Sequence, residues 1–236
     1  MKVRVKFKKY GPVRFIGHLD VMRFFQKAIR RAELDIAYSG GYSPHQIMSF
    51  ASPLGVGLES NGEYMDIELN TVTNSRDMVD KLNKASVPGI EVISMKALPE
   101  GAGNAMASVA AAAYTIRFRD GRAPVFDYMG HIEDFLKQEQ ILITKETKKN
   151  TLEVDLKPGI YDFHANDDGS LYLFVDASSS GNIKPATVIE AYLSMYNETL
   201  QENALMITRE DTYTNIAKPG KKPRFVPLDD IGSNIE

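Results

Sequence analysis

The chain has 236 residues and a formal net charge of −3, and its 43% hydrophobic and 25% charged residues are typical of a soluble globular protein. It has no cysteine, which excludes disulfides, thiolate zinc sites, a cysteine nucleophile and a protein-bound iron–sulfur cluster. No apolar run reaches the length of a transmembrane helix, and the N-terminus lacks the apolar stretch of a signal peptide, so we expect a cytoplasmic protein without membrane contact.

The charge is distributed unevenly along the chain. Residues 1–31 contain ten of the 28 Lys and Arg residues and one acid, Asp20, whereas the other 205 residues contain 18 basic and 30 acidic residues. Such segregation suits an anionic partner such as a phosphate backbone. The alternative is that the two regions complement each other on the folded surface, and the sequence leaves both interpretations open.

The first third of the chain alternates strand and helix patterns. Residues 2–8 alternate apolar and basic side chains, which predicts a strand, and residues 13–16 extend it beyond a Gly-Pro turn. From His18 to Leu34 apolar residues recur at helical spacing with basic residues on the other side, which predicts an amphipathic helix.

The pattern then continues to about residue 99. Residues 38–60 are rich in Gly, Pro, Ser and aromatic residues and have no helical period. A strand at 62–69, a helix from Ser75, as N-cap, to about Ala85 and a strand at 90–98 follow. This order predicts a split βαβ, ferredoxin-like unit.

The remaining sequence repeats this outline. Residues 100–113 are a low-complexity stretch, either a linker or the lead-in to a strand. The patterns after it predict strands at 114–119, 141–147, 151–156, 171–175 and 205–209, helices at 125–138 and 184–196, and a turn at 148–150. We therefore predict an α+β protein of two tandem ferredoxin-like halves, residues 1–99 and 114–215, followed by a tail, residues 216–236, that is extended or disordered in isolation.

Motifs for common chemistries are absent. The sequence has no P-loop, dinucleotide fingerprint, nucleophile elbow or zinc-protease helix, and its four histidines show no metal-ligand spacing. We expect no metal and no cofactor. The backbone N–H groups that begin the helix at His18 are suited to a phosphate, although an ordinary helix cap explains them equally well.

The candidate site residues lie between Arg14 and Gln46. His45 is the catalytic candidate, because it lies in a Gly-rich polar segment after a basic helix, where it could act as a general acid or base; the alternative is a loop histidine that only forms hydrogen bonds. Cations that hold phosphates and aromatic rings that stack on bases together predict nucleic-acid binding. The candidates for this are Arg14, Arg23, Lys27, Arg30, Arg31, Tyr38 and Tyr42, with packing as the alternative role of the two tyrosines.

Five blocks in residues 14–69 carry a family resemblance: RFIGHLD, RRAEL, YSGGYSPHQ, SFASPLGVG and GEYMDIEL. With these blocks in this order, the chain resembles a stand-alone member of the radical-SAM-linked family of unknown function. The resemblance implies work beside a radical-SAM protein, on RNA, and supplies no catalytic residues. A looser similarity, of architecture alone, is to CRISPR repeat-processing endonucleases.

Three functions remain open at this point. We favour a non-enzymatic accessory of a radical-SAM enzyme that binds RNA or presents a substrate through its basic N-terminal surface. The alternatives are a protein-only scaffold of the same partner and a metal-independent RNA-processing endonuclease that uses His45.

Overall fold

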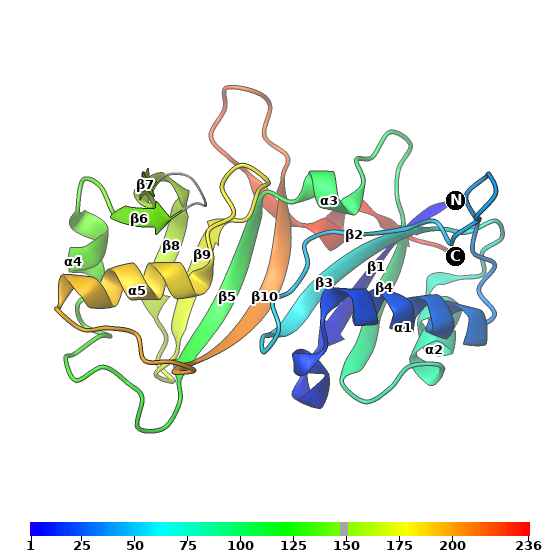
Figure 1. Ribbon diagram of the computed structural model, residues 1–236. Coiled ribbons are helices and arrows are strands. Elements are labelled where there is room, and N and C mark those ends of the chain that lie inside the picture. The colour runs from blue at the N-terminus through cyan, green and yellow to red at the C-terminus, as the bar shows by residue number, and fades with distance from the viewer. Residues whose placement is uncertain (147–150) are drawn as a thin grey trace. The chain divides into compact units, whose positions relative to one another are not determined.

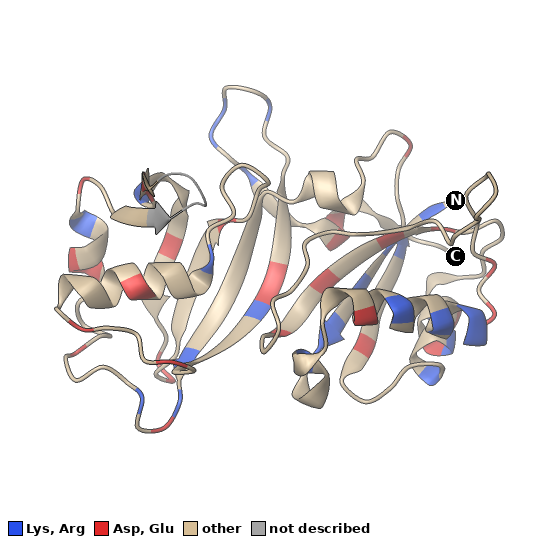
Figure 2. Cartoon of the chain, viewed as in Figure 1, with Lys and Arg blue, Asp and Glu red and all other residues tan. Residues whose placement is uncertain are grey.

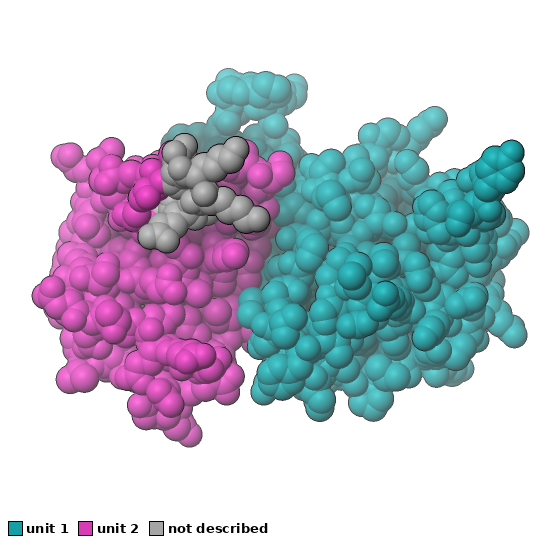
Figure 3. All heavy atoms as spheres, viewed as in Figure 1, with its two compact units in different colours: residues 1–110, 209–236 teal, residues 111–208 magenta. Residues whose placement is uncertain are grey.

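In the computed structural model, which describes residues 1–146 and 151–236, the chain divides into two units (Figures 1 and 3). Unit 1 consists of residues 1–110 and 209–236, and unit 2 of residues 111–208. Five α-helices, α1 to α5, lie within the described residues, and most of the strand pairings given below are antiparallel. The expected mixture of helices and strands is confirmed.

Unit 1 is built on a sheet with the strand order β12-β4-β1-β3-β10, with β2 also paired to β3 and β11 to β10. Its elements in chain order are β1 (Lys2–Lys9), a 3-10 turn (Gly11–Phe15), α1 (His18–Arg31), β2 (Met48–Phe50), β3 (Glu59–Glu68), α2 (Ser75–Lys84), β4 (Ile90–Ala97), α3 (Ala105–Ser108), the second part of β10 (Leu205–Asn215), β11 (Phe225–Pro227), a 3-10 turn (Leu228–Ile231) and β12 (Ser233–Asn234).

Helices α1 and α2 cover one face of this sheet (Figure 1). The inward residues of β1, Val3, Val5 and Phe7, are at most 2% exposed, and Phe25 of α1 packs edge-on against Phe7 at 4.7 Å between ring centroids. Leu82 of α2 is fully buried in the same cluster. The period-2 strand and the amphipathic helix that follows it are therefore confirmed, and together they make the core of unit 1.

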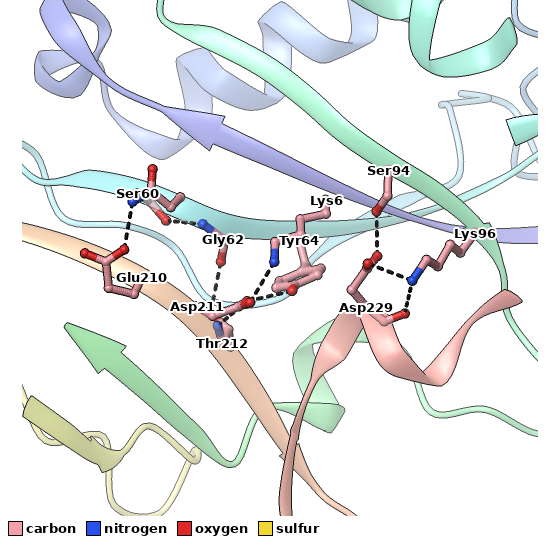
Figure 4. Close-up of polar contacts among 11 residues, drawn as sticks. Lys6, Ser60, Gly62, Tyr64, Ser94, Lys96, Glu210, Asp211, Thr212 and Asp229 are labelled. Carbon is pink, nitrogen blue, oxygen red and sulfur yellow. Dashed lines mark hydrogen bonds and ion pairs between the residues drawn. The ribbon is translucent and has the colours of Figure 1, made fainter. Parts of the chain in front are cut away.

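The opposite face of the sheet is covered by the end of the chain. Arg4, only 1% exposed, forms a two-point ion pair with Asp66 on β3, with Nε–Oδ1 at 2.8 Å and Nη2–Oδ2 at 2.9 Å. Its Nη1 donates to the carbonyl of fully buried Leu228. Asp229 then accepts from Lys96 and Ser94 on β4 (Figure 4). The tail, whose sequence shows no periodic pattern of apolar residues, thus folds onto the sheet.

The contact between β3 and β10 depends on a glycine. A Cβ atom on Gly62 would lie 2.5 Å from the carboxylate and 2.7 Å from Cα of Asp211, so only glycine fits there. The Asp211 carboxylate accepts from the Tyr64 hydroxyl and the Lys6 ammonium, each at 2.6 Å (Figure 4). Burial raises the pKa of Tyr64, which keeps its hydroxyl protonated as the donor.

Unit 2 has a sheet in which β5 lies between β9 and the first part of β10, and β8 pairs with the other edge of β9. Its elements are β5 (Ala111–Phe118), α4 (Ile132–Lys137), a separate hairpin of β6 (Leu142–Glu146) and β7 (Thr151–Asp155), a 3-10 turn (Lys157–Gly159), β8 (Ile160–Ala165), β9 (Leu171–Asp176) and α5 (Pro185–Met195). Its core gathers Phe135 of α4, Leu173 of β9 and Tyr192 of α5, each at most 1% exposed. The turn expected at 148–150 lies outside the described residues.

Several expected elements differ in the structure. Residues 13–16 do not extend the first strand; they lie largely in the 3-10 turn that begins at Gly11 and contains Pro12. The helix expected at 125–138 is confined to α4, because the Asp127 side chain accepts from the backbone N–H of Gly130 and holds that segment in a turn. Strand β8 was not expected at all. The N-cap of α2 is Asn74 rather than Ser75, since the Asn74 side chain accepts from the Asp77 N–H at 2.9 Å.

Candidate functional site

Helix α1 presents a row of cations to solvent. Its inner residues are buried against the sheet, so Arg23, Lys27, Arg30 and Arg31, on the opposite side of the helix, are exposed. Figure 2 shows the basic positions along α1 in blue. The helix begins after Gly17 and carries Asp20 in its first turn and Arg30 and Arg31 in its last, which suits the helix dipole.

These cations are weakly neutralised within the protein. Arg23 forms an ion pair with Asp20 at 3.4 Å, but both side chains are more than 60% exposed. Arg30 and Arg31 donate to the backbone carbonyls of Gln26 and Ala85, which are neutral acceptors. Lys27 has no partner among the residues that the structure describes. The row therefore keeps most of its positive charge for a ligand.

Helix α2 adds two further cations beside the end of α1. Lys81 and Lys84 are exposed and, with Arg31, line an open surface hollow of about 650 Å³. Glu33 lines it as well, as a single acid against three cations. We refer to Arg23, Lys27, Arg30, Arg31, Lys81 and Lys84 as the cationic face.

An aromatic loop adjoins this face. A backbone hydrogen bond from the Ser39 N–H to the His45 carbonyl and a bridge between Tyr38 and Gln46 close residues 38–46 into a hairpin. Gln46 ties this hairpin to α1 by donating to the Gln26 carbonyl at 3.2 Å. Tyr38 is 52% exposed, and Tyr42, at the turn, is fully exposed. The structure thus leaves both rings open to a ligand and close to the helix that carries the cations.

His45 lies on the same loop in open surroundings. Its Nδ1 is 2.9 Å from the Ser39 hydroxyl, which also accepts from the His45 backbone N–H at 3.1 Å. The side chain is exposed, and none of its described hydrogen bonds or ion pairs involves a cation. The geometry is that of a histidine that stabilises a loop, and it does not bring His45 together with the basic residues in a cavity.

Arg14 lies apart from the cationic face. Its Nη1 is 3.0 Å from the Glu59 carboxylate, its guanidinium stacks over Phe15 at 4.9 Å, and its side chain is 31% exposed. His18, the other candidate for phosphate binding, packs its ring edge-on against Phe50 at 5.1 Å. Both residues therefore have partners within unit 1 that account for their positions.

A buried charged cluster lies under the segment that contains His18, and the sequence analysis did not identify it. Lys9, Glu63 and Arg209 are 2%, 6% and 5% exposed. The Lys9 ammonium donates to two backbone carbonyls of residues 14–16, at 3.2 and 3.1 Å, and a guanidinium nitrogen of Arg209 lies 3.1 Å from the Glu63 carboxylate and donates to the Ser52 carbonyl.

Burial determines how these groups titrate. It lowers the pKa of the Lys9 ammonium, against the opposing effect of Glu63, and raises that of the Glu63 carboxyl, against the attraction of Arg209. The hollow that Lys9, Glu63 and His18 line has a volume of only about 10 Å³, enough for a single water. The cluster therefore fastens the segments around α1 to the sheet rather than forming a substrate pocket. One feature of the sequence indicates this cluster: Lys9 follows Val3, Val5 and Phe7 at the two-residue spacing of the inward-facing positions of the first strand.

Among the described residues, no cluster of three His, Asp or Glu side chains is arranged to hold a metal ion. Within the same residues, no helix is both long and apolar enough to cross a bilayer.

Comparison with known proteins places the chain in a family. A search of curated proteins finds no match to it. A family model covers residues 2–185, including the cationic face, the aromatic loop and most of unit 2, and its description is an uncharacterized protein conserved in bacteria (DUF2344). The chain belongs to this uncharacterised bacterial family.

Proposed function

We propose that this protein binds single-stranded RNA through the cationic face and the aromatic loop. The observation that carries the proposal is the exposed row of cations on α1, continued by Lys81 and Lys84 and bordered by two open tyrosine rings. Cations that release counterions from phosphates supply affinity that is independent of sequence, and stacking on Tyr38 and Tyr42 would hold unpaired bases.

We propose further that the protein works as an accessory of a radical-SAM enzyme in the cytoplasm. The support is the resemblance carried by residues 14–69, which include α1 and the aromatic loop. The buried cluster of Lys9, Glu63 and Arg209 brings three of these blocks together in space, because it joins the segment before α1 to the SFASPLGVG segment and to β3.

We also infer that each unit is a ferredoxin-like fold. In unit 2 the support is the element order β5-α4-β8-β9-α5-β10, with β6 and β7 inserted between α4 and β8, together with the strand order β10-β5-β9-β8. In unit 1 the support is the element order β1-α1-β2-β3-α2-β4 with the strand order β4-β1-β3-β2. Both match a split βαβ arrangement in which the first and third strands lie side by side.

The RNA proposal is tested by fluorescence anisotropy with a labelled 20-nucleotide oligouridine at several salt concentrations. Replacing Arg23, Lys27 and Arg30 together with Gln removes three charges from the face without disturbing its buried side. Each lost contact to a single-stranded phosphate lowers the slope of log affinity against log salt by about 0.7, so the slope should fall by about 2.

A matched control separates this effect from net charge. Arg119, Lys137 and Lys184 in unit 2 can be changed to Gln together, which removes the same charge at a distance in sequence from the candidate site. This variant should keep the wild-type slope. Equal losses in the two variants, or none in the first, would remove the support for the cationic face.

A further inference from the structure

A second group of cations lies on the loop that joins β10 to β11. Residues 216–224 contain Lys218, Lys221, Lys222 and Arg224 and no acid. All four are exposed, and the loop projects beyond the strands that it connects (Figures 1 and 2). Their side chains form no ion pair with any other residue of the described ranges. Four positive charges within nine residues are therefore left without an intramolecular counter-charge.

The loop is held in place by its own hydrogen bonds. The Asn215 side-chain oxygen accepts from the backbone N–H groups of Ala217 and Arg224, both at 3.0 Å. Gly220 has a φ of +76° and supplies the turn within the loop, and prolines on either side of it restrict the backbone. A preorganised set of cations loses less conformational entropy when it binds.

The side chains of the loop suit a phosphate backbone. Three of the four cations are lysines, whose ammonium groups bind phosphate oxygens as point charges, and the fourth is an arginine, whose paired donors also match a phosphate. Between Lys218 and Arg224 the loop has no large apolar side chain that would enter a bilayer.

We propose that the β10–β11 loop is a second phosphate-binding element for single-stranded RNA. The choice of RNA as ligand rests on the proposed function, but the loop shares no residue with the cationic face. It leads directly into the segment that covers the sheet on the side opposite α1 and α2, since Leu228 in that segment contacts Arg4. The loop is therefore a binding element separate from the cationic face.

The test uses the full chain and the same oligouridine. In the loop variant, Lys218, Lys221, Lys222 and Arg224 are all changed to Gln, and the slope of log affinity against log salt should fall by about 3, with affinity at 50 mM salt at least about tenfold lower. Changing the three lysines to Arg keeps the charge and should keep the slope. Asn215→Ala loosens the loop without removing charge, so affinity should fall while the slope stays.

The outcomes separate the two proposals. If the variant at Arg23, Lys27 and Arg30 loses affinity and the loop variant does not, the loop proposal is overturned and the proposed function stands. If only the loop variant loses affinity, the loop proposal stands and the cationic face is not an RNA surface. If the wild-type protein binds polyglutamate or phosphatidylserine vesicles but no RNA, both proposals are overturned. Unchanged thermal unfolding of the loop variant shows that any loss is not due to misfolding.

Discussion

The buried ion pair of Arg4 and Asp66 gives the sharpest test of how unit 1 is held together. Arg4→Met keeps most of the side-chain volume but leaves the Asp66 carboxylate, which is 8% exposed, without its cation. The change removes two charge-assisted hydrogen bonds, at 2.8 and 2.9 Å, and a bond to the Leu228 carbonyl at 3.2 Å.

The size of the effect follows from burial. Removing one partner of a buried pair costs about 3–5 kcal/mol, because the remaining charge is desolvated and unpaired. Asp66 also lines a hollow of about 150 Å³ between β2, β3 and the loop before α3, through which water can reach it. We therefore expect about 3 kcal/mol, at the lower end of the range.

Urea unfolding followed by far-UV circular dichroism measures this loss. With a slope of about 2–3 kcal/mol per molar urea, the midpoint should fall by about 1–1.5 M. Arg23→Met is the matched control, because it breaks the exposed pair with Asp20 and should change stability by less than about 1 kcal/mol. The double variant Arg4→Met/Asp66→Leu should recover most of the loss. A wild-type midpoint for Arg4→Met would refute the reasoning.

Three further outcomes follow from single sites. Tyr42→Ala should lower RNA affinity about 5- to 100-fold while the salt slope stays constant, since a stacking ring carries no charge; an altered slope would contradict a stacking role. Gly62→Ala should cost about 1–3 kcal/mol in urea unfolding, because its Cβ would collide with β10, whereas Gly40→Ala meets no atom within 4 Å and serves as control. Hydrogen bonds from Ser170, aided by an arginine, lower the pKa of Asp168 to about 2. Its stabilising contribution is present above the ordinary value of 3.8 and lost as pH falls towards 2, and Ser170→Ala should raise the pKa in an NMR titration.

Elements with a long, regular pattern could be predicted from the sequence. The helix from His18 and the strand before it are set by apolar residues at helical and period-2 spacing, and both occur as expected. The prediction of a helix at 125–131 is wrong because the Asp127 side chain accepts a local hydrogen bond that competes with helix formation. The apolar residues of this segment nevertheless have helical spacing. The end of the chain lacked a pattern because Leu228 packs on a sheet made by residues far away in the sequence.

Some residues of the candidate site could likewise be predicted from the sequence, and others could not. The exposed cations of α1 were predictable, since a helix that buries its apolar face must expose the other. That Arg14 would be paired with Glu59, and that Lys9 would be buried near Glu63 and Arg209, depends on strand pairings that no local pattern specifies.

The two interpretations of the charge segregation in residues 1–31 turn out to concern different residues. Arg4, Lys6 and Arg14 form ion pairs with Asp66, Asp211 and Glu59, so acids from β3 and β10 neutralise the cations of β1 and of the turn after it. Complementation within the fold thus accounts for the cations before α1 that form these pairs. It does not account for α1, where the ion pair between Arg23 and Asp20 is long and exposed. The positive charge of residues 1–31 that a polyanion would meet is therefore localised in part on the exposed cations of α1. That localisation is why a change at Arg23, Lys27 and Arg30 tests RNA binding without disturbing the ion pairs that hold the sheet.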